Sequence, residues 1–384
     1  MADRILTTHA GSLPRPDELA DMVWARMDGE AVDEAQLEAK MDAAVADLVG
    51  KQREVGLDVI SDGEMSKPGF STYISDRFSG FGGGTSEFQS DDVAPFPELA
   101  MKLFANPQTA HLGFSYCVGP VELADKEAVN RDIARFKAAL GDTDPSGAFM
   151  GTISPGQIAF NYPDQHYGSH EKYLAACADA LAHEYRAIVD AGFNLQIDSP
   201  DMAMAAHARS VGSSVGDWHH HLPLAVEALN GALDGIPADR VRFHVCWGNT
   251  GTPHHLDVPL ADIIDHVLGV NAGTIYVEGA NPRHAHEWRV FRDVELPADK
   301  SVILGVIDVK SNYVEHPRVV ADRLVQVAQF VGKDRLMAGT DCGFGTFIRW
   351  SLVDPGVMWL KMGSLVEGAE IASNELKPGR RGCN

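Results

Sequence analysis

The sequence predicts one α/β domain, a (β/α)8 barrel that spans residues 1–384. Eight short segments rich in apolar and β-branched residues alternate with longer helical patterns, and eight is the strand number of this barrel. A chain of 384 residues is long enough to enclose such a core. The composition, with 22% charged and 45% hydrophobic residues, is that of a globular protein.

The predicted strands and helices alternate along the chain. The strands are expected at residues 5–8, 58–61, 147–153, 194–198, 241–246, 274–278, 302–307 and 335–340. The clearest helical patterns cover residues 33–55, 170–191, 221–234, 259–270 and 317–331. Gly56 and Gly192 follow two of these helices directly, as glycine commonly does at a helix C-terminus.

One segment, from about residue 62 to 146, is too long for a simple connection between a strand and the next helix. We predict that it leaves the barrel as a long excursion after the second strand, with a hairpin near 114–118 and a helix near 125–140. The glycine-rich residues 81–86 are expected to form a flexible loop. Because no helix with GxGxxG spacing follows them, they do not indicate a nucleotide site.

Charge and cysteine content narrow the expected partners and location. The net charge of −22 argues against nucleic acid and anionic membranes as partners, and no segment approaches the roughly 20 apolar residues of a membrane span. The N-terminal residues 1–7 lack the apolar core of a signal peptide. Five sparse cysteines do not form a disulfide framework. We therefore expect a cytoplasmic protein.

Polar residues cluster where the predicted strands end. In a (β/α)8 enzyme the active site lies at the C-terminal ends of the strands, because the loops converge there. Single serines and aspartates at such positions also cap helices, but a set of this size on one rim indicates a functional site. Its members are Ser12, Asp62, Glu64, Asp198, His244, Cys246, Glu278, Asp308, Lys310 and Cys342.

Four of these residues are candidate zinc ligands. His244 and Cys246 are two positions apart in a predicted strand, so their side chains point to the same face. Together with Cys342 and Glu278 they offer the nitrogen, sulfur and oxygen ligands that Zn²⁺ takes. Zinc in such a site lowers the pKa of a thiol substrate, so the sequence indicates activation of a thiol.

The sequence motifs resemble those of the catalytic barrel of cobalamin-independent methionine synthase. The resemblance runs from Thr7 to about Thr346. It is carried by Thr-Thr-His-Ala-Gly-Ser at 7–12, Asp-Gly-Glu at 62–64, Gln-Ile-Asp at 196–198, His-Val-Cys at 244–246, Val-Glu at 277–278, Gly-Val-Ile-Asp at 305–308 and Thr-Asp-Cys-Gly at 340–343.

The resemblance implies a role for most of the polar rim. It assigns zinc to His244, Cys246, Glu278 and Cys342. It further implies that Ser12 holds the carboxylate of a homocysteine-like substrate, while Glu64 and Asp198 hold its ammonium group. The implied activity is transfer of a methyl group to this thiol.

The sequence also departs from the family pattern. The family's second, N-terminal barrel is absent, so we expect a stand-alone form of the catalytic barrel. Phe160 or Tyr162 stands near the position of the tryptophan that packs on the family's folate. Lys310, beside Asp308, replaces the histidine proposed as proton donor. We therefore expect Asp308 and Lys310 to be the catalytic pair, and methyltetrahydrofolate to be a poor donor.

Three functions follow from this pattern. The first is zinc-dependent methyl transfer to a thiol such as homocysteine. The second is the reaction of the similar epoxyalkane:coenzyme M transferases, which open an epoxide with a zinc-bound thiol; its sulfonate would require arginines, and Arg15 and Arg283 lie near barrel-end motifs. The third is a zinc-binding barrel without catalysis, which predicts no pocket beside the metal. The expected partners are a small-molecule thiol and an alkyl donor, with homo-oligomerisation left open.

Overall fold

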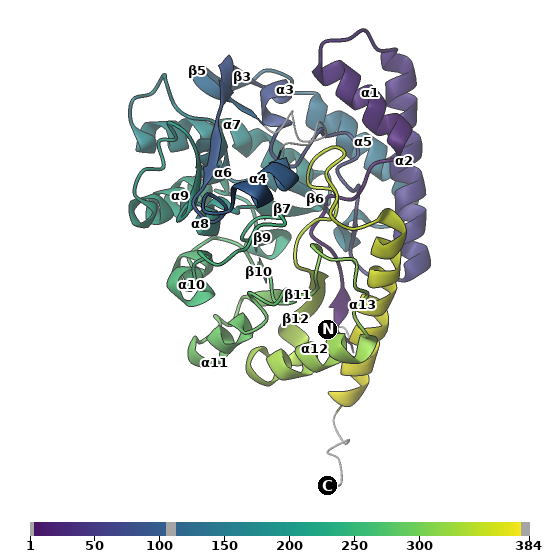
Figure 1. Cartoon of the computed structure of the whole chain (residues 1–384). Helices are drawn as coiled ribbons and strands as arrows, with labels where there is room; N and C mark the ends of the chain where they lie inside the picture. The colour runs from purple at the N-terminus through teal and green to yellow at the C-terminus, as the bar shows by residue number, and fades with distance from the viewer. Residues whose placement is uncertain (1–3, 105–112, 378–384) are drawn as a thin grey trace.

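The computed structural model contains a closed barrel of eight parallel strands surrounded by helices (Figure 1), and it describes residues 4–104 and 113–377. The barrel strands are β1 (Leu6–Thr7), β2 (Ile60–Ser61), β6 (Ala148–Ile153), β7 (Asn194–Asp198), β9 (Val241–Val245), β10 (Thr274–Val277), β11 (Ser301–Ile307) and β12 (Leu336–Thr340). Their order is β1-β12-β11-β10-β9-β7-β6-β2, with every neighbouring pair parallel. Val59 N donates to Thr7 O over 3.0 Å, which joins β2 to β1 and closes the ring.

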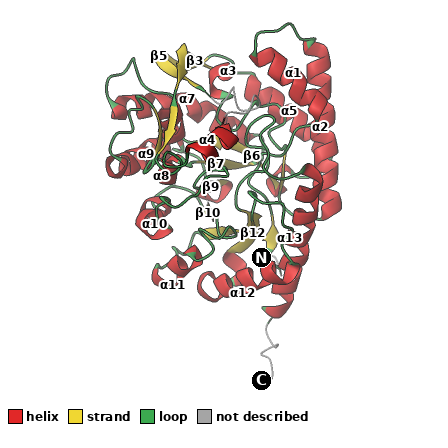
Figure 2. Cartoon of the chain, in the orientation of Figure 1, coloured by secondary structure: helices red, strands yellow, loops and turns green. Residues whose placement is uncertain are grey.

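The outer helices follow the strands in turn, so that red helices surround the yellow strands in Figure 2. They are α1 (Asp17–Met27), α2 (Glu34–Val55), α5 (Ala128–Leu140), α7 (His170–Asp190), α9 (Trp218–Ala232), α10 (Leu260–Leu268), α11 (Val290–Asp293), α12 (Pro317–Val331) and α13 (Pro355–Glu375). Short 3₁₀ turns lie at Pro145–Gly147, Ala238–Arg240, Glu287–Arg289 and Lys333–Arg335. The fold class, the eight strands and the five clearest helices are thus confirmed.

Local sequence explains several helix ends. The side chain of Asp33 accepts a hydrogen bond from Gln36 N at the start of α2, and Gly56 ends this helix at a φ of 91°. Helix α9 begins at Trp218, three residues before the predicted start, because Asp217 caps it through His219 N. Helices α1 and α13 were not among the clearest patterns, yet both contribute buried residues to the core.

The excursion after β2 is more ordered than expected. It holds α3 (Ile74–Arg77), β3 (Phe78–Ser86), β4 (Phe88–Ser90), α4 (Pro97–Phe104) and β5 (Phe114–Leu123), and the predicted helix near 125–140 is α5, which packs beside α2. Strand β5 pairs with β3 in an antiparallel ribbon, at the upper left of Figure 1. The prediction of a hairpin near 114–118 is therefore wrong, because these residues form a single strand, β5, whose partner β3 lies far away in the sequence.

The expectation of a flexible loop at residues 81–86 is wrong, because this segment belongs to β3. Its glycines permit a close approach of the two strands: a Cβ at nearby Gly80 would lie 2.5 Å from Pro120 O. Three smaller elements complete the fold, namely α6 (Pro155–Asn161), α8 (Asp201–Met204) and β8 (Ala208–Ser210). Strand β8 pairs with β4 and so ties the excursion to the loop after β7.

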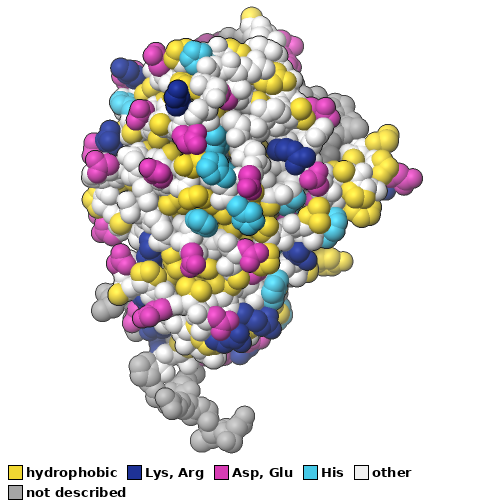
Figure 3. Space-filling model, turned by 90° about the vertical axis from the view of Figure 1, so that its left-hand side faces the viewer, with side chains coloured by type: hydrophobic (Ala, Val, Ile, Leu, Met, Phe, Trp, Pro, Cys, Tyr) yellow, Lys and Arg dark blue, Asp and Glu magenta, His cyan; other side chains and the backbone are white. Residues whose placement is uncertain are grey.

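The described surface carries no single-signed patch on the face shown in Figure 3, where acidic, basic and histidine side chains are interspersed with hydrophobic ones. Within residues 4–104 and 113–377, none of the helices combines the length and apolarity required to cross a membrane. The prediction of a cytoplasmic location used residues 1–3 and the cysteine content. Residues 1–3 and Cys383 lie outside the described residues.

Burial of His9 beneath the barrel rim makes stability sensitive to acid. Its Nε2 lies 2.7 Å from Gln52 Oε1 and its Nδ1 accepts from Gly11 N, so the ring is neutral. Burial, opposed by Gln52 and aided by the charge of Arg242, lowers the pKa of His9 to about 4. Because the folded-state pKa is lower than that of the unfolded chain, this contribution is complete above about pH 6.5 and is lost as the pH falls through about 4.

We expect the His9 contribution to be on the order of 3 kcal/mol of unfolding free energy between about pH 6.5 and 4. Urea unfolding of the wild type and of His9→Gln across this range measures it. The variant should show a shallower dependence on pH, and equal slopes for both proteins would contradict the assignment.

Candidate active site

Three soft ligands meet at the C-terminal rim of the barrel. His244 lies in β9, Cys246 follows this strand, and Cys342 follows β12. Their ligand atoms all lie within 4.8 Å of one another, and the two Sγ atoms are 3.8 Å apart. Strands β10 and β11 separate β9 from β12 in the sheet, so the curvature of the barrel brings Cys342 to the other two residues.

The chemistry of this trio fits a cation such as Zn²⁺. All three side chains are buried, and neither ring nitrogen of His244 has a hydrogen-bond partner among the described residues. Contact with the Cys342 thiol, together with burial, raises the pKa of Cys246 well above its usual value. Two adjacent thiolates here would therefore require a positive ion between them, and imidazole plus thiolates is a ligand set typical of zinc.

Glu278, the fourth predicted ligand, follows β10 and is completely buried, but it is not part of this trio. Its Oε1 accepts from Trp247 N over 3.0 Å. Its Oε2 accepts from Asn281 Nδ2 over 2.6 Å and lies 3.2 Å from Lys310 Nζ. The carboxylate is thus held beside the trio by three donors.

The predicted catalytic pair occupies two different environments. Lys310 is partly buried, and although burial lowers its pKa, the charges of Glu278, Asp341 and both cysteines raise it, which favours the charged form. Asp308 instead caps its own turn, where its carboxylate accepts from Lys310 N over 3.0 Å and from Ser311 Oγ over 2.6 Å. Neither residue lines the pocket described below.

The predicted substrate residues do come together. Glu64 and Asp198 approach the same point on β6: a Cβ on Gly151 would lie 3.1 Å from Glu64 Oε1 and 3.8 Å from Asp198 Oδ2. Glu64 is held at a φ of 58°, a strained conformation of the kind found at functional sites, and its Oε2 is buried without a hydrogen-bond partner among the described residues. Burial, partly offset by His244 and reinforced by Glu64, raises the pKa of Asp198 to about 7.

Ser12, the third predicted substrate residue, lies in the pocket wall next to the metal-ligand trio. It faces the residue after Cys342, since a Cβ on Gly343 would lie 2.6 Å from Ser12 Oγ. Ser12, Asp198, His244, Cys246 and Cys342 all line one pocket of about 750 Å³. A zinc-binding barrel without catalysis is expected to have no pocket beside the metal. A pocket of this size beside the trio contradicts that function.

The remainder of the pocket is rich in aromatic residues and, over the described residues, has neither lysine nor arginine. Its aromatic members are Phe70, Phe88, Phe114, Phe160, Phe347 and Trp350. Among the described lining residues there is no lysine or arginine, whereas Glu87, Asp91 and Asp198 are acidic. Strand β4 and the residues after it supply one wall, so the excursion completes the site.

Of the two aromatic residues predicted to contact a cofactor, Phe160 lines the pocket and Tyr162 does not. Phe160 meets Phe88 edge to face at 6.0 Å. Tyr162 lies behind α6, where its hydroxyl donates to Ser71 O and its ring packs on Phe81 and Phe114. Phe160 lies in the last turn of α6, whereas Tyr162 follows the helix with an extended backbone, so the two side chains point in different directions.

The two arginines considered for a sulfonate are occupied by backbone carbonyls. Arg15 donates to Glu64 O over 2.7 Å and to Gly345 O over 3.2 Å. Arg283 donates to His255 O and Asp257 O. Neither lines the pocket.

Sequence reasoning missed two residues that position the site. Lys67 Nζ lies 3.3 Å from Glu64 Oε1 and donates to Gly151 O over 2.5 Å, and Asn281 donates to Glu278. Each follows its partner by three residues, but in a loop this spacing predicts no contact. The aromatic lining from the excursion carried no signal in the sequence either.

Comparison with known proteins identifies matches along most of the chain. The family described as "Cobalamin-independent synthase, Catalytic domain" matches residues 5–89 and 159–354. The chain is 27% identical over 376 residues to a methionine synthase from Thermococcus kodakarensis, covering 96% of this chain and 94% of that protein. It is also 27% identical over 404 residues to a 2-hydroxypropyl-CoM lyase from Xanthobacter autotrophicus, covering 97% and 96%.

Among solved structures, the chain resembles a B12-independent methionine synthase from Shewanella sp. W3-18-1 in complex with selenomethionine. The TM-score is 0.73 at 22% identity, and the match covers 97% of this chain and 99% of that one. At this level of identity the match shows a common fold.

Proposed function

The chain belongs to the family of cobalamin-independent synthase catalytic domains, an enzyme family, and from this premise we propose that it transfers a methyl group to the thiol of homocysteine. The observation that carries the proposal is the trio His244, Cys246 and Cys342 beside a pocket lined by Asp198, whose carboxylate lies near that of Glu64. The synthase from Thermococcus kodakarensis, similar over nearly its whole length, supports the same activity.

The residues present fit zinc, which we propose to be held by His244, Cys246 and Cys342, with Glu278 as a weaker fourth ligand. Bound zinc would supply one thing, a lower pKa for the substrate thiol, so that the thiolate is available at neutral pH. Lys310, Asn281 and Trp247 N hold the Glu278 carboxylate when it is not on the metal. These donors stabilise the displaced position of Glu278.

The substrate's other end is bound by the barrel rim. The ammonium group of homocysteine is placed between Glu64 and Asp198, where a cation relieves the repulsion of two buried carboxylates. The Ser12 hydroxyl donates to the substrate carboxylate. These contacts hold the thiol at the trio and exclude water from it, because the surrounding pocket is lined by aromatic rings.

The charge of the pocket limits which alkyl donors can bind. Folates carry anionic glutamate carboxylates, yet the described pocket lining offers no cationic side chain to receive them. Phe160 is one of the six aromatic side chains in the pocket that a donor could contact. We propose a neutral or cationic donor with an apolar or flat aromatic body. The chain is proposed to act as one barrel domain in the reducing cytoplasm, where its thiols remain free.

The second candidate function is the opening of an epoxide by a zinc-bound thiol. The 2-hydroxypropyl-CoM lyase relative supports it. Coenzyme M carries a sulfonate, which calls for cationic side chains. The occupied positions of Arg15 and Arg283 favour homocysteine over coenzyme M.

Turnover with each combination of thiol and alkyl donor tests the proposal. Zinc-loaded protein is mixed with homocysteine or coenzyme M, proton release is recorded, and turnover is measured with methyltetrahydrofolate, methylcobalamin, an activated methyl compound or an epoxide. We expect homocysteine to release about one proton per chain, and methyltetrahydrofolate to be a poor donor compared with methylcobalamin or the activated methyl compound. Proton release and turnover only with coenzyme M and an epoxide would establish the second function. Efficient turnover with methyltetrahydrofolate would show that Phe160 and Lys310 replace the family's residues.

A further inference from the structure

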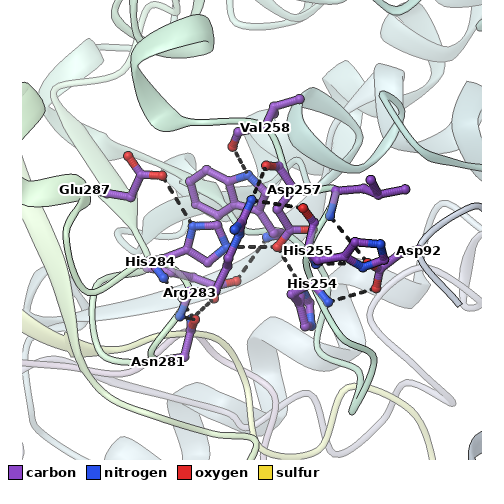
Figure 4. Close-up of polar contacts among 12 residues, drawn as sticks. Asp92, His254, His255, Asp257, Val258, Asn281, Arg283, His284 and Glu287 are labelled. Carbon is purple, nitrogen blue, oxygen red and sulfur yellow. Dashed lines mark hydrogen bonds and ion pairs between the residues drawn. The ribbon is translucent and has the colours of Figure 1, made fainter. Parts of the chain in front are cut away.

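A second group of buried imidazoles surrounds Asp257, in the loops that follow β9 and β10 (Figure 4). His254 Nδ1 lies 2.8 Å from Asp257 Oδ2, and His284 Nε2 lies 2.9 Å from the same oxygen. His207 Nε2 approaches Asp257 Oδ1 to 3.0 Å without the alignment of a hydrogen bond. All four side chains are buried, and the proposed reaction uses none of them.

The outer nitrogens of two rings also face acceptors. His254 Nε2 lies 3.1 Å from Thr250 O, and His284 Nδ1 lies 3.5 Å from Glu287 Oε1. A backbone carbonyl only accepts, and so does an ionised carboxylate. The inner nitrogens of both rings are directed at the same oxygen, Asp257 Oδ2. A metal ion on these inner nitrogens fits the arrangement, because metal-bound histidines commonly donate their other N–H to a carbonyl or carboxylate.

The surrounding chain holds the ligands in place before any ion binds. Both carboxylate oxygens of buried Asp92 accept backbone N–H groups, from His254 and His255. His254 is held at a φ of 57°, an unfavourable conformation for a histidine. The Trp247 ring stacks on His284 with 4.1 Å between ring centroids. Such preorganisation is typical of metal sites, in which fixed neighbours orient the ligands.

We propose that His254 Nδ1, His284 Nε2 and the Asp257 carboxylate form a second metal site, for a divalent transition cation of the zinc class, with His207 as a further ligand within reach. Two imidazoles and a carboxylate suit Zn²⁺ and its neighbours better than Ca²⁺ or Mg²⁺, which prefer oxygen ligands. The site shares no ligand with the His244, Cys246 and Cys342 trio, and it does not depend on the proposed reaction.

The position of the site indicates a structural role beside the active site. Trp247 connects the two: it follows Cys246, its N–H donates to Glu278, and its ring covers His284. Thr250, whose carbonyl receives His254, lines the pocket. An ion at this second site would therefore fix the part of the pocket wall formed by residues 248–250.

Metal affinity at the site should fall as the pH is lowered, because an imidazole nitrogen binds a metal ion only when it carries no proton.

Cobalt(II) distinguishes the two sites, because a thiolate ligand gives an intense charge-transfer band that a site of nitrogen and oxygen ligands lacks. We expect wild-type protein to bind about two equivalents of Co²⁺ per chain. The double variant Cys246→Ser/Cys342→Ser should lose the thiolate band but keep about one equivalent, and Zn²⁺ should still raise its melting temperature. His284→Gln should keep the thiolate band and lose the other equivalent.

The control is His286→Gln, which changes an exposed histidine two residues from His284 and should retain both equivalents. Circular dichroism confirms that each variant is folded. If the cysteine variant does not fold, comparison of His284→Gln with His286→Gln in the otherwise wild-type chain decides the question. Binding of one equivalent by the wild type, or equal retention in His284→Gln and His286→Gln, would overturn the proposal, the latter indicating an adventitious ion only.

Discussion

Replacement of Cys246 or Cys342 by serine is expected to remove the thiolate-bound zinc, about one ion per chain, and with it all turnover. A serine hydroxyl is a poor zinc ligand at neutral pH, because its oxygen remains protonated where a thiol ionises on the metal. The two sulfur atoms lie only 3.8 Å apart beside His244, so the loss of either opens the same site.

Metal analysis of the purified variants, after exhaustive dialysis, measures this effect. Cys177→Ser is the matched control, since Cys177 is also a buried cysteine but lies in α7, away from the trio. The control should retain the wild-type zinc content. Undiminished zinc in both Cys246→Ser and Cys342→Ser would show that the trio is not the metal site.

Neutralisation of Glu64 or Asp198 is expected to weaken binding of the thiol substrate without unfolding the protein. Glu64→Gln or Asp198→Asn should reduce homocysteine binding by about 1.5–3 kcal/mol, the usual scale for a charge-assisted hydrogen bond. The melting temperature should stay within a few degrees of the wild type, because the two buried carboxylates repel each other in the absence of substrate.

Titration calorimetry with homocysteine, paired with thermal melts, separates binding from stability. Asp58→Asn is the control: this carboxylate precedes β2 and accepts from Thr7 N, so its replacement should cost stability and leave the affinity unchanged. Large destabilisation with unchanged affinity in the Glu64 and Asp198 variants would assign both residues to the fold.

Much of the fold follows from local signals in the sequence. The eight strands were predictable because each is short, apolar and completely covered by helices, and helix α2 was bounded by Asp33 and Gly56. The alternation of side chains along a strand is likewise sufficient to place His244 and Cys246 on one face. These features depend on neighbours a few residues away, which the sequence displays directly.

Other features depended on contacts between distant segments. Gly80 and the glycines after it resemble a loop until β5 lies beside them and pairs with their backbone. Phe160 and Tyr162 are equivalent in the sequence, but α6 ends between them and only Phe160 lines the pocket. The sequence indicates Glu278 as an unpaired ligand, but in the structure its carboxylate contacts Lys310 and Asn281.

The grouping of side chains around each site was decided by the tertiary structure alone. Closure of the barrel brings Cys342 to Cys246 across 96 residues of chain, and the loops after β9 and β10 bring His284 to Asp257 across 27. The type of side chain and the periodicity of the strands could therefore identify candidate metal ligands. Which of them share an ion is set by barrel curvature and loop packing, because such long-range contacts leave no periodic signal in the sequence.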